Sequence, residues 1–117
     1  MKHQPIYIII GVGVLLLFAA CGRQQQAKSV VKAFMAEQLH REDVSYIDFS
    51  NVDSTHTFND SLIGALRQHG PKDVSYQPWQ GRTLLHIRAK YRVEQDTCST
   101  TFYLDPEATG VVAFKDN

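Results

Sequence analysis

Apolar and polar residues recur along this chain with two periods, and the longer period predicts two helices. Over residues 27–39 the apolar positions follow the i, i+3, i+4, i+7 spacing of one helical face, and charged residues occupy the other face. A second stretch with this spacing begins after Thr57, a residue type that caps helix N-termini. It ends at Gly70 and Pro71, because glycine supplies a left-handed cap and proline cannot continue a helix.

The shorter period, an alternation of apolar and polar residues, predicts strands in the rest of the chain. The predicted strands cover residues 44–52, 82–93, 97–105 and 111–114. If Gln95 and Asp96 form the tip of a hairpin, the numbers of paired residues sum to 191, and both apolar faces lie on the same side of the sheet. In the last strand we expect Val112 and Phe114 to face the core, because they bury more area than their neighbours.

The order of these elements predicts an α+β fold. We expect two helices packed on a curved antiparallel sheet of four to five strands, in the order α-β-α-β-β-β-β, with a signal-peptide helix in front. Across residues 27–114 this order resembles that of the nuclear transport factor 2-like fold and of the broader cystatin-like α+β roll. The resemblance implies a cone between sheet and helices in which a partner or small ligand binds.

The first twenty residues have a different character. Residues 6–20 are apolar without a break and follow Lys2. As a helix this segment would rise about 22 Å, whereas the hydrocarbon core of a bilayer is about 30 Å thick. Its length, and the small residues at its end, fit a secretory signal better than a membrane span.

Residues 18–21, Phe-Ala-Ala-Cys, resemble the lipobox of bacterial lipoprotein signal peptides, with Phe18 where an aliphatic residue is more common. The resemblance implies cleavage before Cys21 and acylation of its thiol, which would anchor the protein in a lipid bilayer. The domains are then the signal peptide (1–20), the lipidated cysteine with a polar tether (21–26) and a small α+β domain (27–117). Because Gly22 and not aspartate follows, the resemblance implies the cell outer membrane, on its periplasmic face, with surface display as the alternative.

Composition narrows the function classes. After residues 1–20 are removed, eleven basic residues stand against twelve acidic ones, a formal charge of −1. A nucleic-acid binder would be strongly basic, so we expect no nucleic-acid partner. With Cys21 acylated, Cys98 has no partner for an internal disulfide. The histidines lack the spacing of zinc ligands, and we expect neither a metal nor a cofactor.

A row of basic residues is the first candidate binding site. Arg88, Lys90 and Arg92 share one face of the predicted strand 82–93. One interpretation is an ordinary solvated sheet face, and the other is a contact surface for an acidic partner or lipid headgroups. In the predicted register Tyr103 lies across from Arg88 on this face, which would help either kind of contact.

The turn-like segment 77–81, Gln-Pro-Trp-Gln-Gly, is the second candidate. Its tryptophan, Trp79, either docks a partner, since aromatic residues are enriched at binding hot spots, or folds back as a lid on the core. The segment also resembles the Gln-x-Val-x-Gly loop of cystatin protease inhibitors, with Trp79 in place of the valine. That resemblance implies a protease inhibitor.

The predicted strand faces support an enzymatic function less well than a binding function. Cys98 and His86 would be a nucleophile and its base, but the predicted hairpin places them on opposite faces. An enzyme in the cone would need an inward carboxylate or histidine, and every inward position we assign is apolar, Thr or Cys. We expect a non-enzymatic, membrane-tethered domain, without catalytic residues, that binds a protein partner or small ligand in the cell envelope. The alternatives are a small enzyme using the cone and an inhibitor using the Trp79 loop.

Overall fold

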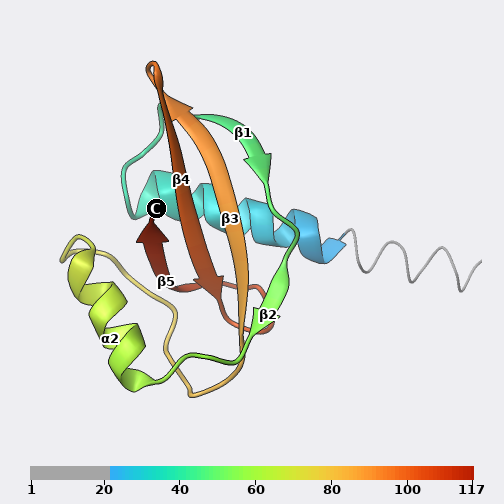
Figure 1. Ribbon diagram of the computed structural model, residues 1–117, viewed down its shortest axis with the longest axis vertical. Helices are drawn as coiled ribbons and strands as arrows, with labels where there is room; N and C mark the ends of the chain where they lie inside the picture. Colours follow the sequence, from blue (N-terminus) through green and yellow to red (C-terminus); the bar gives the residue numbers. More distant parts are fainter. Residues whose placement is uncertain (1–21) are drawn as a thin grey trace, which may run out of the picture.

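The computed structural model describes residues 22–117 (Figure 1), so the predicted signal peptide, its lipobox and Cys21 lie outside the described residues. The α+β class is confirmed, with two helices and a five-stranded antiparallel sheet among the described residues. In chain order the elements are a helix over residues 22–37, β1 (Ser45–Phe49), β2 (Asp53–Thr55), α2 (Asp60–His69), β3 (Leu84–Val93), β4 (Asp96–Leu104) and β5 (Val111–Asp116). No described helix is long and apolar enough to cross a membrane.

The sheet has the order β1-β3-β4-β5, and β2 also pairs with β3. β1 and β2 lie one after the other along the same edge of β3, so the strand predicted at 44–52 is in fact the first of two short strands. Ser50 bridges the break between them. Its N–H donates to the Arg88 carbonyl at 2.9 Å, and its hydroxyl accepts from the Arg88 N–H at 2.8 Å.

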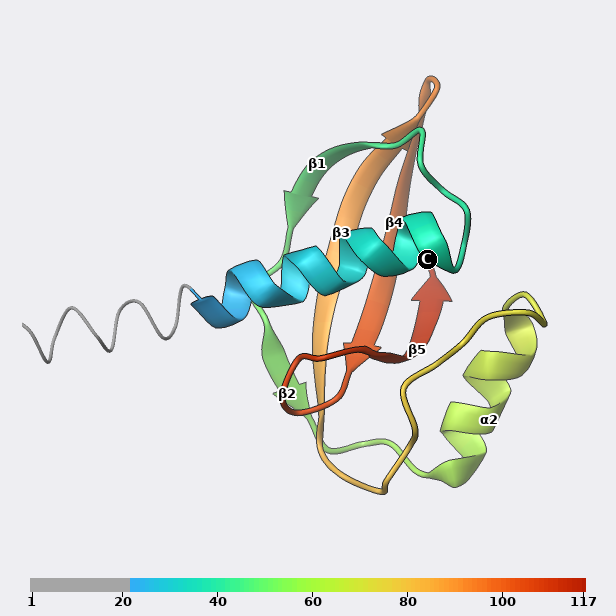
Figure 2. The same ribbon diagram turned by 180° about the vertical axis from the view of Figure 1, so that it is seen from behind.

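Helix 22–37 crosses one face of the sheet (Figure 2) and forms the main core with it. Phe34 and Met35 are buried, as predicted. The Phe34 ring lies 5.9, 6.1 and 5.6 Å from the rings of Tyr76, Phe102 and Phe114. Burying a large apolar side chain contributes about 1.5–3 kcal/mol, so this aromatic cluster holds the helix on the sheet.

The helix begins earlier than its apolar pattern predicts, because residues 22–26 are helical and contact the domain. The Gln24 side chain donates to the Ser50 carbonyl at 3.0 Å and accepts from the Val52 N–H at 2.8 Å. The Gln26 side chain donates to the Ala108 carbonyl at 3.0 Å. The polar tether expected at these positions is therefore part of the folded domain.

The second helix, α2, is capped differently from the prediction. Asn59, not Thr57, is the N-cap, since its side-chain oxygen accepts from the Leu62 N–H at 2.9 Å. At the other end Gly70 has φ −90°, so it is not a left-handed cap. A Cβ at Gly70 would come within 3.0 Å of the Tyr76 hydroxyl, so this position favours glycine through close packing and not through its backbone conformation.

α2 lies beside β5 (Figure 1) and does not share the sheet face that helix 22–37 covers. Its buried residue Ile63 packs with Leu84, Val112 and Ala113 in a second cluster. Leu84 points to the opposite face from its neighbour Leu85, which belongs to the main core. The two helices therefore enclose no common cone.

The β3–β4 hairpin turns one residue earlier than predicted. Val93 pairs with Asp96, so the numbers of paired residues sum to 189, and Glu94 takes a left-handed conformation with φ 57°. A shift of two in this sum leaves every residue on its predicted face, because side chains alternate with a period of two. It does change partners: Tyr103 pairs with His86 and not with Arg88.

In β5 the predicted inward pair is half correct. Phe114 faces the main core, but Val111 joins it there and Val112 belongs to the second cluster. The cause is a register shift between Tyr103 and Leu104, which rotates the start of β5 relative to its end.

The open sheet face as candidate functional site

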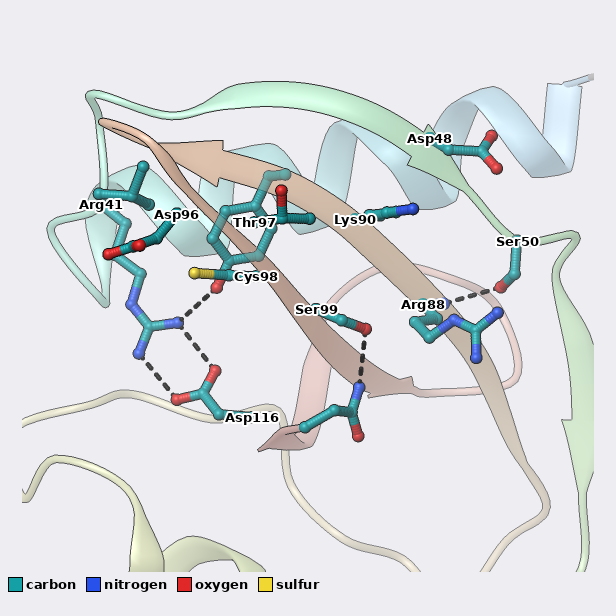
Figure 3. A pocket seen from close by; sticks show the side chains of 13 residues that line it. Arg41, Asp48, Ser50, Arg88, Lys90, Asp96, Thr97, Cys98, Ser99 and Asp116 are labelled. Carbon is teal, nitrogen blue, oxygen red and sulfur yellow. Dashed lines mark hydrogen bonds and ion pairs between the residues drawn. The ribbon is translucent and has the colours of Figure 1, made fainter.

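The sheet face opposite helix 22–37 is open over β1, β3 and the first half of β4. The outward side chains there include Arg88, Lys90 and Arg92 on β3 and Thr97 and Ser99 on β4. A hollow of about 860 Å³ lies at this face and wraps around the end of the sheet (Figure 3); its lining includes Arg88, Lys90, Ser99, Cys98, Arg41 and Asp116.

The side chains of the basic row are exposed and form no ion pair with the described residues. Arg88, Lys90 and Arg92 are exposed, and they alternate along β3, so neighbours in the row stand about 6.6 Å apart along the strand. Asp48 pairs with Lys90 across the strands. Among the described residues no member of the row has an ion-pair partner within 4.0 Å. The row is therefore free to bind an anionic group, and Asp48 and Asp96 also line the hollow beside it.

Hydroxyl groups border the basic row, and the last residue of the chain organises them. The Asn117 side-chain amide donates to the hydroxyls of Ser99 and Thr101 at 3.0 and 3.1 Å, and the Asn117 N–H donates to the Ser99 carbonyl at 2.8 Å (Figure 3 draws the Ser99 contact). Because both hydroxyls accept from Asn117, their own hydrogens stay free to donate to a ligand. Free hydroxyl donors beside cations suit an anionic group.

At the end of the hollow, four side chains form a closed ring of hydrogen bonds. Arg41 donates to Asp116 through two nitrogens, each at 2.9 Å, and to the Tyr91 hydroxyl at 3.1 Å. The Thr100 hydroxyl donates to Asp116 at 2.7 Å and lies 2.8 Å from the Tyr91 hydroxyl. Since the hydrogen of Thr100 goes to the carboxylate, the Tyr91 hydroxyl donates to Thr100.

This ring is an ion pair and not an acid–base device. The hydrogen bonds from Arg41 hold the pKa of Asp116 below its usual value, with a further contribution from Thr100, while burial opposes them. The hydrogen bond with Asp116 raises the pKa of Arg41. Both groups stay charged at neutral pH. The ring thus fastens the segment that follows helix 22–37 and the end of β5 to the sheet.

Trp79 and Tyr103 lie elsewhere. The Trp79 ring is half-buried against the second cluster, and its indole N–H donates to Asp60 at 2.6 Å. Tyr103 packs on Phe58, with 4.5 Å between ring centroids, and burial raises its pKa. Trp79 therefore packs against the second cluster, and neither aromatic residue lines the hollow beside Arg88.

Two other expectations concern reactive groups. Cys98 pairs with Tyr91, and its side chain lies on the sheet face opposite that of His86, which pairs with Tyr103. In the described part of the chain, no three His, Cys, Asp or Glu side chains come close enough together to hold a metal ion.

The fold and the site together define a small α+β domain with one covered and one open, basic sheet face. Comparison of the chain with protein-family models, with curated proteins and with solved structures finds no match. The resemblances to nuclear transport factor 2-like and cystatin-like proteins remain predictions.

Proposed function

We propose that this protein is an envelope lipoprotein whose domain binds an acidic partner on its open sheet face without catalysing a reaction. The observation that carries the proposal is the exposed basic row of Arg88, Lys90 and Arg92, of which Arg88 and Lys90 line a hollow of about 860 Å³. Three cations without ion-pair partners among the described residues attract a negatively charged group and speed its encounter with the face.

The anchoring part of the proposal rests on the sequence. The apolar segment 6–20 and the cysteine that follows it fit a lipoprotein leader and an acylated thiol at Cys21. An acylated protein is confined to the envelope, where its partner is a membrane component or a protein held nearby. Confinement raises the effective concentration of such a partner, so that a modest electrostatic contact suffices.

The arrangement of the ionisable groups favours binding over catalysis. Asp116 lines the hollow, and three hydrogen bonds from Arg41 and Thr100 occupy it. A general base needs a free lone pair within reach of its substrate. For the inhibitor alternative, the Trp79 loop would have to project, whereas the Gln77 N–H donates to the Val111 carbonyl at 2.7 Å and Trp79 is tied to Asp60.

The test uses the full-length chain expressed in a bacterial envelope, with a photo-crosslinking residue at Thr97, which is exposed on the open face. We expect crosslinked products that disappear in Arg88→Glu/Lys90→Glu. The charge reversal Lys72→Glu, after α2 and away from this face, should leave them unchanged. A crosslinking yield as high in Arg88→Glu/Lys90→Glu as in Lys72→Glu would show that the basic row does not bind the partner.

A further inference from the structure

We infer that the flank of the domain formed by β1 and the start of helix 22–37 lies against an anionic lipid surface. Five residues form this flank patch: Lys28, Lys32, Tyr46, Ile47 and Phe49. The rings of Tyr46 and Phe49 stack with 5.3 Å between centroids. The Lys28 ammonium lies 5.6 Å from the Phe49 ring, and the Lys32 ammonium lies 5.4 Å from the Tyr46 ring. Ile47, which lies between Tyr46 and Phe49 in the sequence, is 48% exposed.

The patch combines the groups that sit well at the surface of a bilayer. Tyrosine rings settle at the level of lipid headgroups, and lysine stems lie along apolar surface while the ammonium group reaches phosphate. An exposed large aliphatic side chain such as Ile47 gains by leaving water. Asp48, the acid within β1, pairs with Lys90 of β3, and the register shift between Tyr46 and Asp48 leaves Ile47 exposed beside it at the β1 edge.

The chain itself brings the patch to a membrane. Figures 1 and 2 show β1 and the start of helix 22–37 on the same side of the molecule. Gly22 is already helical, and Arg23 donates to the Pro106 carbonyl at 3.0 Å, in addition to the two contacts of Gln24. Consecutive Cα atoms are about 3.8 Å apart, so a lipid on Cys21 reaches the domain without slack.

The inference rests on the anchoring part of the proposed function, but not on the cleavage step. If the leader is removed, the acyl chains on Cys21 hold Gly22 at the bilayer. If it stays, the apolar residues 6–20 do so. The first turn of helix 22–37 is held at the surface and is hydrogen-bonded to the loops at Ser50 and Pro106. The domain therefore has few orientations available. The one that buries Ile47 and brings Lys28 and Lys32 to lipid phosphates turns the β1 edge of the sheet toward the surface.

The test places a single tryptophan on either side of the molecule. In the full-length chain Trp79→Phe removes the native tryptophan, and Ile47→Trp or Leu62→Trp introduces one. Ile47 and Leu62 are similarly exposed, at 48% and 45%, so Leu62 on α2 is the matched control. The protein is placed in vesicles of brominated phosphatidylcholine and phosphatidylglycerol. We expect bromine to quench the fluorescence at position 47 and not at position 62.

Charge reversal tests the lysines. Each lysine near an anionic surface strengthens binding, so Lys28→Glu/Lys32→Glu should lower the docking equilibrium constant at least about 30-fold and abolish the quenching at position 47. Lys72→Glu, after α2, should leave the quenching unchanged. In the unsubstituted chain, phosphatidylglycerol vesicles should slow the acetylation of Lys28 and Lys32 relative to Lys72, whereas neutral vesicles should not.

The outcomes separate the two proposals. A chain that does not remain with the vesicles would overturn both the anchor and the docked flank. A chain that remains, but is quenched at neither position or equally at both, would overturn the docked flank alone. Equal acetylation of the three lysines on both kinds of vesicle would do the same without any substitution. None of these results depends on whether the basic row binds a partner.

Discussion

The ring of Arg41, Tyr91, Thr100 and Asp116 predicts a specific pattern of coupled stability changes. Thr100 is fully buried and Tyr91 is 3% exposed, so neither hydroxyl can exchange its partner for bulk water. Thr100→Val keeps the side-chain shape but removes the acceptor of the Tyr91 hydroxyl. A buried donor left unpaired costs about 1–3 kcal/mol, so we expect the free energy of unfolding to fall by about 2 kcal/mol.

The double variant distinguishes a ring from two independent contacts. Tyr91→Phe alone should lower the free energy of unfolding by about 1 kcal/mol, since Thr100 and Arg41 still bind Asp116. In Thr100→Val/Tyr91→Phe both hydroxyls are gone and no donor is left unpaired. The double variant should therefore be about 1 kcal/mol more stable than the sum of the single changes predicts.

The assay is urea unfolding at neutral pH with a constant slope, so that midpoint shifts report stability. The control is Thr97→Val/Tyr91→Phe, because Thr97 is on the same strand but points to the open face. This control should be additive to within about 0.5 kcal/mol. If the effects of Thr100→Val and Tyr91→Phe add up as closely as those of the control pair, the Tyr91 hydroxyl does not donate to Thr100 and the ring does not exist.

Three further predictions concern single groups. Tyr76→Phe should leave stability unchanged or raise it by about 1 kcal/mol in the urea assay, since the Tyr76 hydroxyl is buried without a partner; a loss would contradict this. Lowering the pH should destabilise the protein as it falls below about 3.9, the unfolded pKa of an aspartate, because the folded pKa of Asp116 is depressed; Asp116→Asn should weaken this dependence, and an unchanged pH profile would contradict it. Gln24→Ala should lower the free energy of unfolding by about 1–2 kcal/mol by removing two hydrogen bonds, whereas Gln25→Ala, at an exposed position beside it, should not; equal effects would contradict the docking of Gln24.

The sequence was sufficient to predict the faces of the central strands, but not their partners. Alternation assigns each residue of β3 and β4 to one face or the other. Every register in which the numbers of two paired residues add up to an odd number places the apolar faces together equally well. Choosing among such registers requires the turn. The turn at Glu94 and Gln95 contains no glycine, and the left-handed φ of Glu94 is unusual for glutamate, so the local signal was absent.

The position of α2 could have been predicted from a signal that was present. Leu84-Leu85 and the run from Val111 to Phe114 break the alternation with consecutive apolar residues. Such runs indicate burial on both faces, and both faces are covered at these places, one by helix 22–37 and the other by α2. The apolar face of α2 alone did not say which side of the sheet it would occupy.

The ring at the end of the hollow had no local signature. Arg41 follows the first predicted helix, Tyr91 and Thr100 are on different strands, and Asp116 is the last residue but one. Only the assembled sheet brings these four positions together. The basic row was predictable for the opposite reason, because its three members share one strand and the period of two suffices to group them.

The two proposals together restrict the kind of partner. If the flank patch lies on a bilayer, the sheet stands with β1 nearest the surface and with α2 farthest away, as the strand order and Figure 1 indicate. β3 is the next strand, about 5 Å further from the surface. The basic row then lies within about one Debye length, roughly 8–10 Å, of the headgroups, and faces along the membrane and not away from it. A ligand diffusing far from the membrane would meet α2 before it met this row. The arrangement therefore favours a partner that is itself bound at the membrane surface, and the crosslinked product at Thr97 should sediment with membranes after the domain has been released from its anchor by proteolysis.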